Sequence, residues 1–299
     1  MYPRWFAVSF TGTPHEMKDS APAAAAGTVR LGNRDVNRLG FGAMRITGDG
    51  VWGPPEDPDS AHRVLQRSVE LGVQLIDTAD SYGPDVSEEL IAEALHPYPE
   101  DVIIATKGGL ERGGPGQWSA NGRPEHLREA CEGSLRKLQV DHIDLYQLHA
   151  PDSDVPYEES IGALVELRDE GKIVHIGVSN VNSENLSTAR GLTEIASVQN
   201  RFNLSDRSNE DVLEMCTDEG IAFLPWFPLG AGTPAEVAGD IARARGVSAH
   251  AVAIAWLLHR SPVIVPIPGT SSVDHLEENV GAGSLELSEE ELAELSGAD

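Results

Sequence analysis

The chain has 299 residues, which is enough for one large domain or two small ones, and its 40% hydrophobic residues allow a sizeable core. Its formal net charge of −26 disfavours binding to nucleic acid or to anionic membranes, because like charges repel each other. No apolar run approaches the roughly 18 residues of a membrane span, so we expect a cytoplasmic protein. The acidity fits either an acidic proteome adapted to a salt-rich cytoplasm or an ordinary acidic enzyme.

Metal and disulfide chemistry are disfavoured by the cysteine pattern. The only cysteines are Cys131 and Cys216; both fall in helix-like segments, and no CxxC or Cys/His cluster is present. We therefore expect no bound metal ion, and the pattern is compatible with a reducing compartment.

Strand-like and helix-like segments alternate along the chain from residue 28 onward. The strand-like runs are residues 38–44, 74–79, 102–107, 143–150, 173–179, 197–202, 222–227 and 263–268. Apolar residues three and four positions apart indicate amphipathic helices at residues 60–71, 86–95, 125–138, 158–170, 184–191, 209–219, 249–259, 273–280 and 289–295. This alternation predicts an α/β protein with a (β/α)8 TIM barrel. A doubly wound open sheet competes with it, but the first strand lacks the GxGxxG turn of that fold.

The expected domain organisation is a disordered N-terminal extension, residues 1–26, followed by a single barrel domain, residues 27–299. The alanine-rich residues 21–26 are counted with the extension. Residues 27–36 have the pattern of a β-hairpin with Gly32 and Asn33 at its turn, and we expect this hairpin to close the floor of the barrel.

Four polar residues stand at or just after the ends of three successive strand-like runs. Asp77 lies near the end of the second run and Tyr82 follows it, Lys107 ends the third, and His149 is the last residue but one of the fourth. In a parallel barrel those strand ends meet at the end of the barrel where active sites are built. Each residue alone is explained as well by a structural role, but together they predict a catalytic site.

Six motifs in chain order resemble those of the aldo-keto reductase superfamily. They are the IDTADSYG motif at residues 76–83, the strand that ends at Lys107, DLYQLH at 144–149, GVSN at 177–180, VQN at 198–200, and IPGT at 267–270 with Glu278 and Asn279. Residues 36–44, 50–55 and 267–273 look most like the branch that includes bacterial pyridoxal reductases. The resemblance covers residues 28–299 and implies a TIM barrel that reduces a carbonyl group with a nicotinamide cofactor.

The resemblance implies a role for each of the four polar residues. Tyr82 is the expected proton donor, and a free phenol has a pKa of about 10. We expect the positive charge of Lys107 to lower that pKa, and Asp77 to keep Lys107 charged. His149 is expected to orient the substrate oxygen as a neutral hydrogen-bond donor. Two other acids, Asp80 and Asp144, are expected to stand outside the site, with Asp80 facing solvent and Asp144 too early in its strand.

The cofactor is expected to be NADPH, with NADH as the alternative. The resemblance assigns the nicotinamide end to Ser179, Asn180 and Gln199, with Trp226 in the place of a stacking tyrosine. The ribose and pyrophosphate portions are assigned to Gly42, Ala43, Met44, Asp77, Leu229 and Gly230. The adenine end falls on Thr270, Ser271, Ser272, His275, Glu278 and Asn279. Relatives often carry Lys or Arg where this chain has Ser271 and Ser272, so a phosphate would be held there by hydroxyl and N–H groups.

Trp52 and Trp118 fall in the loops after the first and third strands and are the candidates for the substrate wall, although either ring could equally serve as an anchor for its loop. The expected partner is a small-molecule carbonyl compound, and the expected assembly is a monomer or weak oligomer. We expect an NADP(H)-dependent reductase of aldehydes or ketones, such as pyridoxal. A cofactor-binding regulatory protein, like the β-subunits of some channels, is the alternative, because the fold alone does not choose between them.

Overall fold

The computed structural model describes residues 21–230 and 236–297. Its central feature is a seven-stranded parallel sheet in the order β11-β10-β9-β8-β5-β4-β3. The strands are β3 (Phe41–Gly42), β4 (Leu75–Asp77), β5 (Ile103–Gly108), β8 (Ile143–Leu148), β9 (Ile173–Ser179), β10 (Ser197–Gln199) and β11 (Ala222–Phe223). Neighbours in the sheet are neighbours in the chain apart from a hairpin inserted between β5 and β8, as expected when helices return the chain after each strand.

The expected eighth strand, residues 263–268, closes the barrel without forming a regular strand. Backbone hydrogen bonds join Phe223 N to Val263 O (2.9 Å) and Val265 N to Phe223 O (2.8 Å), and Gly40 N on the other side donates to Pro266 O (2.9 Å). Pro266 and Pro268 have no N–H to donate, so the ladder is reduced to one isolated bridge between Phe223 and Ile264. The predicted (β/α)8 barrel is confirmed in this form.

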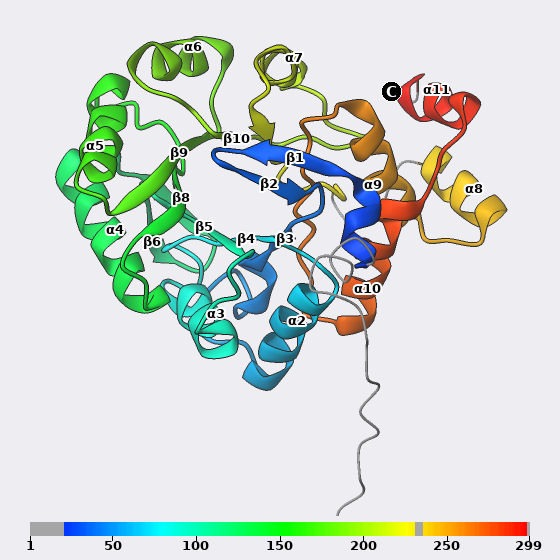
Figure 1. Cartoon of the computed structure of the whole chain (residues 1–299), viewed down its shortest axis with the longest axis horizontal. Coiled ribbons are helices and arrows are strands. Elements are labelled where there is room, and N and C mark those ends of the chain that lie inside the picture. The colour runs from blue at the N-terminus through cyan, green and yellow to red at the C-terminus, as the bar shows by residue number, and fades with distance from the viewer. Residues whose placement is uncertain (1–20, 231–235, 298–299) are drawn as a thin grey trace, which may run out of the picture.

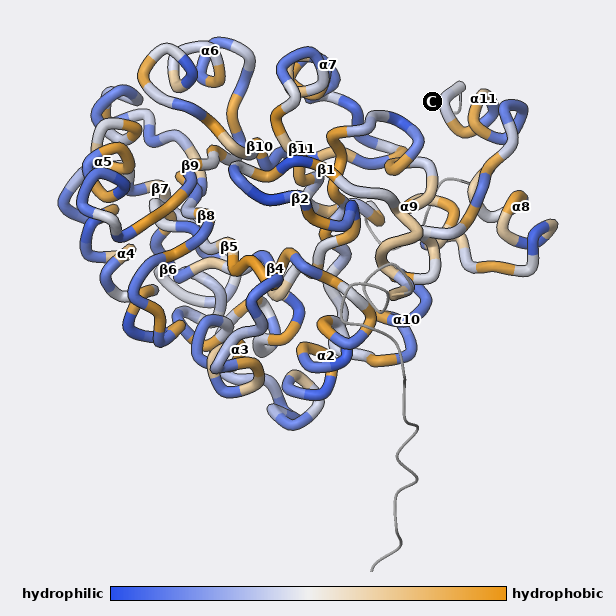
Figure 2. Tube along the Cα trace, in the orientation of Figure 1, coloured by the Kyte–Doolittle hydropathy of each residue, from blue (hydrophilic) through white to orange (hydrophobic). Residues whose placement is uncertain are grey.

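Helices surround the sheet on its outer side (Figure 1). They are α2 (Pro58–Glu70), α3 (Val86–Leu95), α4 (Pro124–Leu138), α5 (Tyr157–Asp169), α6 (Ser183–Leu192), α7 (Glu210–Glu219), α8 (Glu236–Arg245), α9 (Ala249–Arg260), α10 (Val273–Gly281) and α11 (Glu289–Gly297). Hydrophobic and hydrophilic stretches alternate along these helices (Figure 2), as expected when one side faces the sheet. In α4 the buried side carries Leu127, Cys131 and Leu138, as the periodicity predicted.

Two elements were not expected from the sequence. Helix α8 packs against α9 and buries Ala238, Ile241 and Ala242, but Gly239 and its charged neighbours weaken its apolar pattern. The strands β6 (Leu110–Gly114) and β7 (Gln117–Ala120) form a separate antiparallel hairpin directly after β5. The glycines and Pro115 at its tip are turn residues, so its short strands gave no signal of their own.

The predicted N-terminal hairpin is confirmed as β1 (Thr28–Leu31) and β2 (Arg34–Asn37), which pair in antiparallel fashion. Gly32 stands at its turn with φ of 57°, and a β-carbon there would lie 2.4 Å from the His175 ring. Asn33 N donates to Nε2 of His175, at the start of β9, over 3.2 Å. The hairpin therefore lies at the end of the barrel where the strands begin (Figure 1).

The expectation of a disordered extension over residues 1–26 is wrong for its last part. Residues Pro22–Ala26 form a 3-10 helix, and the side chains of Ala23 and Ala26 are buried against the barrel. Ala23 N donates to Leu71 O at 3.0 Å, so this segment is tied to the C-terminal end of α2. Residues 1–20 of the predicted extension lie outside the described residues.

A buried carboxyl group in α3 makes the stability depend on pH. Glu88 is 0% exposed, and Thr106 Oγ1 donates to its Oε1 at 2.6 Å, but its Oε2 has no hydrogen-bond partner among the described residues. Burial raises the pKa of Glu88 to about 6. Since the folded pKa exceeds the unfolded value, ionisation above pH 6 destabilises the folded state, and this cost disappears as pH falls towards 4.5.

We therefore expect Glu88→Gln to raise the free energy of unfolding at pH 7.5 by about 2 kcal/mol. The gain should be mostly lost near pH 4.5 and vanish at lower pH, because the wild-type carboxyl is then protonated in both the folded and the unfolded state. Thermal unfolding of both proteins at the two pH values measures it. The exposed neighbour Glu89 is the matched control, and Glu89→Gln should change neither value. A gain of the same size at both pH values would contradict the assignment.

Candidate active site

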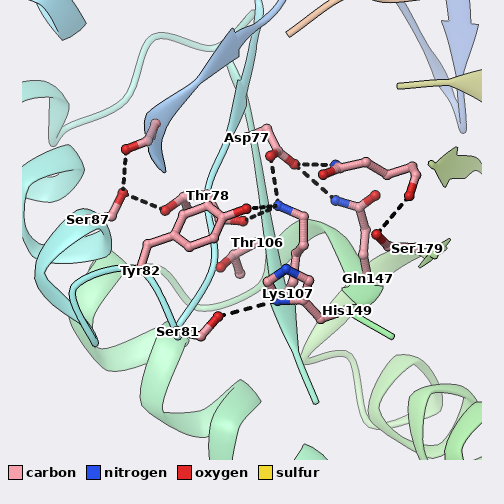
Figure 3. A network of polar contacts seen from close by, with 12 residues as sticks. Asp77, Thr78, Ser81, Tyr82, Ser87, Thr106, Lys107, Gln147, His149 and Ser179 are labelled. Atoms are coloured by element: carbon pink, nitrogen blue, oxygen red, sulfur yellow. Dashed lines mark hydrogen bonds and ion pairs between the residues drawn. The ribbon is translucent and has the colours of Figure 1, made fainter. Parts of the chain in front are cut away.

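A buried ion pair forms the centre of the site. Lys107 Nζ, at the end of β5, donates to Asp77 Oδ2 at 2.7 Å and to Thr78 O at 2.8 Å (Figure 3). Asp77 is 2% exposed and Lys107 is 0% exposed. Charges this deep are tolerated only when they are paired and hydrogen-bonded. Burial, the largest single effect, lowers the pKa of Lys107, but the charges of Asp77 and Tyr82 and the hydrogen bonds to them together outweigh it, so the pKa is raised and the ammonium stays charged.

Two amide side chains complete the shell of Asp77. Gln147 Nε2 from β8 donates to Asp77 Oδ1 at 3.1 Å, and Gln199 Nε2 from β10 donates to the same oxygen at 2.7 Å. Ser197 Oγ in turn donates to Gln147 Oε1 at 3.3 Å. The carboxylate accepts from three side chains on three strands, so its position is fixed by the barrel.

Tyr82 lies in the loop after β4 with its hydroxyl beside the ammonium. Lys107 Nζ donates to Tyr82 Oη over 3.3 Å, which leaves the phenolic hydrogen free to point elsewhere. The expectation that the pKa of Tyr82 is lowered is wrong for the cofactor-free protein, because burial raises the pKa more than the charge of Lys107 lowers it. The phenol is therefore held protonated, with a cation in place for the negative charge that it acquires on losing its proton.

His149 follows β8 and stands edge-on to Tyr82, with ring centroids 5.8 Å apart. Burial, with a smaller effect from the charge of Lys107, places the pKa of His149 well below its usual value, so the imidazole is neutral. Its Nδ1 lies 3.3 Å from Ser81 Oγ (Figure 3). When Ser81 donates to Nδ1, the ring carries its proton on Nε2, which has no protein partner among the described residues.

The two acids expected to stand outside the site behave differently. Asp144, as expected, is at the opposite end of its strand, 3.7 Å from Arg34 of the N-terminal hairpin. The prediction that Asp80 faces solvent is wrong. Its Oδ1 is buried without a hydrogen-bond partner among the described residues, and burial raises the pKa of Asp80 well above the ordinary value. The loop after β4 turns inward at this point, which its sequence did not indicate.

These groups line a cavity of about 460 Å³ at the end of the barrel where the strands finish. Twelve of the predicted site residues line it: Gly42, Met44, Asp77, Tyr82, Trp118, His149, Ser179, Asn180, Gln199, Trp226, Leu229 and Gly230. Lys107 lies beneath the wall and reaches the cavity only through Asp77 and Tyr82. Ala43 is wholly buried, and its carbonyl accepts from Ser87 Oγ, so its predicted cofactor contact is not through its side chain.

One wall of the cavity is a network of Ser179, Asn180 and Trp226. Ser179 Oγ donates to Gln199 O at 2.8 Å, and Asn180 Nδ2 donates to His149 O at 2.9 Å. Trp226 Nε1 donates to Asn180 Oδ1 at 3.0 Å, which ties the indole to the amide. Asn180 has φ of 57°, a left-handed conformation that asparagine tolerates better than most residues. The wall is thereby rigid before any ligand binds.

The residues predicted for an adenine group lie around the start of α10, outside the cavity. Ser272 is the N-cap residue of α10, and its Oγ accepts from His275 N at 3.4 Å. Thr270 Oγ1 accepts from Ser272 N at 3.0 Å, so both hydroxyls already serve the helix start. Ser271, His275 and Glu278 are exposed, whereas Asn279 is buried. None of these residues lines the cavity, although Gly269 just before them does, so a ligand that contacts both regions must extend beyond the cavity towards α10.

The two tryptophans predicted for the substrate wall have different positions. Trp118, on β7, lines the cavity with its ring 6.4 Å from the rings of both Tyr82 and His149. Trp52 does not line the cavity, so of the two roles expected for it the structure favours the loop anchor: the guanidinium of Arg112 lies 5.6 Å from its ring centroid. An isolated parallel β-bridge joins Trp52 to Gly83, in the loop after β4.

Several lining residues were missed from the sequence: Arg45, Leu110, Phe227, Pro228, Ile267, Pro268 and Gly269. Arg45 is an exposed cation without a hydrogen bond or ion pair among the described residues, and only its neighbours in the motif were selected. Phe227, next to the selected Trp226, lines the cavity with φ of 58°. Gly42 approaches the last barrel segment so closely that a β-carbon would lie 2.6 Å from Ile267 O.

A (β/α)8 barrel with a lysine–carboxylate pair, a tyrosine and a neutral histidine at its catalytic end is the framework of a barrel oxidoreductase. The comparison with protein families agrees, since residues 38–299 match the aldo/keto reductase family. The chain belongs to that family, and it is an enzyme of the aldo-keto reductase type.

The relatives extend this assignment. The chain is 48% identical to an uncharacterised oxidoreductase of Schizosaccharomyces pombe, over 91% of this chain and 90% of that protein. It is 43% identical to pyridoxine 4-dehydrogenase of Escherichia coli, over 91% of this chain and 98% of that protein. Among solved structures, an aldo/keto reductase from Klebsiella pneumoniae in complex with NADP and acetate superposes with a TM-score of 0.75 at 28% identity, covering 90% of this chain and 93% of that one.

Proposed function

We propose that this protein is an NADPH-dependent reductase of aldehydes or ketones, with Tyr82 as the proton donor and a pyridine aldehyde such as pyridoxal as a substrate. The observation that carries the proposal is that Lys107 Nζ donates to both Asp77 Oδ2 and Tyr82 Oη at the wall of the main cavity. The pyridoxine 4-dehydrogenase of E. coli supports the substrate class, and the NADP complex from Klebsiella pneumoniae supports the cofactor.

The donor set of the cavity fits a nicotinamide. A carboxamide needs both donors and acceptors, and Ser179, Asn180 and Gln199 offer hydroxyl and amide groups in one wall. The flat indole of Trp226, held by Asn180, offers a stacking surface for an aromatic ring. Arg45 lines the same cavity and offers a positive charge to an anionic group. In a chain of net charge −26, an arginine without a carboxylate partner at the main cavity favours an anionic ligand.

The bound cofactor supplies a hydride to the carbonyl carbon, and the residues of this chain manage the charge that appears on the carbonyl oxygen. Tyr82 gives its phenolic proton to that oxygen, and the ammonium of Lys107, 3.3 Å from Oη, stabilises the phenolate that remains. Asp77 keeps the ammonium charged and in place. His149, neutral and protonated on Nε2, donates a hydrogen bond to the carbonyl oxygen and does not compete as an acid.

The proposal is tested by NADPH oxidation with pyridoxal, methylglyoxal and 4-nitrobenzaldehyde, and by the same assay with NADH. Turnover of at least one carbonyl compound with NADPH is the expected result. Tight cofactor binding without turnover of any carbonyl compound would instead favour the regulatory alternative.

The preference for NADPH over NADH depends on the start of α10 in this proposal. Ser271 is exposed there, and its carbonyl accepts from Ser60 Oγ at 3.2 Å, so the side chain is free to be enlarged. Ser271→Arg should tighten NADPH binding by about tenfold, because a charged hydrogen bond to the 2′-phosphate is added. NADH binding should change less than twofold, by the general attraction alone.

Equilibrium titration of both cofactors measures the effect without turnover. Ser187→Arg, on the exposed side of α6, adds the same charge elsewhere and is the matched control. Equal tightening of NADPH and NADH by Ser271→Arg would show that this segment does not face the 2′-phosphate. The expected monomeric or weakly oligomeric state and the cytoplasmic location remain parts of the proposal.

A further inference from the structure

The β6–β7 hairpin lies over the substrate side of the cavity and has little hydrophobic support. It forms a two-stranded sheet of its own, the four residues of β7 are all exposed, and the Trp118 side chain is 40% exposed. An isolated two-stranded hairpin is marginally stable in water. Leu110 and Trp118 of this hairpin nevertheless line the cavity. Something other than apolar packing must hold them in position.

Arg112 provides that support through its whole guanidinium group. Its Nη1 donates to Val51 O at 2.6 Å and to Ser81 O at 2.9 Å. Its Nη2 donates to Gly50 O at 2.9 Å, and Nε donates to Gln117 O at 3.2 Å. These carbonyl groups belong to the loop after β3, the loop after β4 and the hairpin itself. No carboxylate among the described residues pairs with Arg112, so its guanidinium is held by backbone carbonyl groups.

The same guanidinium stacks on the indole that faces the site. Arg112 and Trp118 are directly opposite each other in the hairpin register. The Arg112 guanidinium carbon lies 3.6 Å from the Trp118 ring centroid, a close cation–π geometry. The Trp52 ring lies on the guanidinium as well, at 5.6 Å. One face of Trp118 is thus occupied, and the indole plane stands at 84° to the Tyr82 ring and 68° to the His149 ring.

Arg112 donates a hydrogen bond to a residue whose backbone conformation is strained. Val51 has φ of 56°, which is rare for a β-branched residue and costs on the order of 1–3 kcal/mol. Its carbonyl oxygen receives the shortest of the Arg112 hydrogen bonds. Ser81, whose carbonyl oxygen receives another, holds its hydroxyl 3.3 Å from Nδ1 of His149. Ser81 therefore connects Arg112 to both catalytic side chains, because it precedes Tyr82 in the chain and contacts His149.

We infer that Arg112 is a positioning residue that determines substrate specificity, by fixing the Trp118 indole as a wall for flat, aromatic carbonyl substrates. The inference rests on the proposed carbonyl reductase function. An aromatic aldehyde gains contact area from a rigid indole beside its ring, whereas a small aliphatic aldehyde does not reach it. Arg112 itself touches no reacting atom, so its effect is exerted through Trp118 and the three joined loops.

The kinetic test compares an aromatic with a small substrate. Arg112→Ala should raise KM for 4-nitrobenzaldehyde about tenfold, the range of a lost cation–π contact with its ordered wall. KM for methylglyoxal and the Kd of NADPH should change less than about threefold. Arg136→Ala, an exposed arginine of α4 without a side-chain hydrogen bond or ion pair among the described residues, is the control and should change none of these values. Equal losses for both substrates, or weaker NADPH binding, would overturn the inference.

A double-mutant cycle shows whether Arg112 acts through Trp118. Trp118→Ala should raise KM for 4-nitrobenzaldehyde to a similar extent, and the double variant should lose about tenfold in total. A loss of about a hundredfold in the double variant would mean independent roles and would overturn the inference. If Arg112→Ala does not fold, Arg112→Lys serves instead, because it keeps the charge but loses the planar fork and should show about a threefold rise.

A second readout does not require turnover. Acrylamide quenching of the Trp118 emission, taken as the difference between proteins with and without Trp118, should increase in Arg112→Ala because the indole is released to solvent. If the wild-type protein reduces no carbonyl compound, the proposed function fails, but this measurement still tests whether Arg112 holds the Trp118 indole in place. Unchanged quenching of Trp118 would show that the arginine does not hold the indole.

Discussion

Tyr82→Phe is expected to reduce carbonyl turnover by on the order of 10²–10⁴-fold, the usual contribution of a positioned general acid. The substitution removes only the hydroxyl that lies 3.3 Å from Lys107 Nζ and keeps the buried ring. Steady-state assays with NADPH and pyridoxal measure the loss. The Kd of NADPH should stay within about threefold, because the lost group acts on the substrate oxygen.

Tyr157→Phe is the matched control for that substitution. Tyr157 begins α5 and does not line the cavity, and its buried hydroxyl has no hydrogen-bond partner among the described residues. Removing that hydroxyl should leave turnover unchanged. Retention of most activity in Tyr82→Phe would exclude this tyrosine as the proton donor. Because the pKa of Tyr82 is raised, we also expect its hydroxyl to stay protonated throughout the neutral pH range.

Lys107→Met should impair both stability and catalysis. It leaves the carboxylate of Asp77 buried without its cation, and breaking a buried pair in this way costs about 3–5 kcal/mol. The two glutamine donors to Asp77 Oδ1 remain, so we expect the lower end of that range. Turnover should fall by on the order of 10³-fold, because the phenolate of Tyr82 loses its counter-charge. Chemical denaturation and single-turnover kinetics measure the two effects.

The combination Lys107→Met with Asp77→Asn separates these contributions. Neutralising the stranded carboxylate should recover stability, whereas turnover should remain low, because the ammonium is still absent. Lys172→Met is the control, since this lysine is partly exposed at the opposite end of the barrel and pairs with Glu132 and Glu170. Its loss should cost about 1 kcal/mol or less. Similar destabilisation by both lysine substitutions would contradict the role of burial.

The regular parts of the fold were predictable because their apolar residues follow one periodicity for a long enough run. Strands β5, β8 and β9 are buried along almost their whole length and were found nearly at their true ends. The last barrel segment was also found, although Pro266 and Pro268 prevent a regular ladder there. Helix α8 and the β6–β7 hairpin were missed, since glycine, proline and charged residues interrupt their patterns.

The active site shows a similar division. Asp77, Lys107 and His149 were identifiable because each stands at a strand end, and parallel strands finish at one end of a barrel. Gln147 was hidden in the same motif as His149, although it donates to Asp77 across the barrel. The pKa of Tyr82 was predicted in the wrong direction, because proximity to a cation is visible in the motif but the depth of burial is not.

The order of elements, the end of the barrel that carries the chemistry and the residue types that gather there all follow from local periodicity and strand-end position. Those properties are encoded by neighbours in the chain. Three features depend on residues that approach each other only after folding. They are the burial of Asp80 Oδ1, the position of Trp52 outside the cavity, and the hydrogen bonds of Arg112 to three loops. Contacts between segments that are far apart in the sequence determine these features, as does the burial of polar groups between those segments. A pattern of residues along the chain does not show which distant segments will meet.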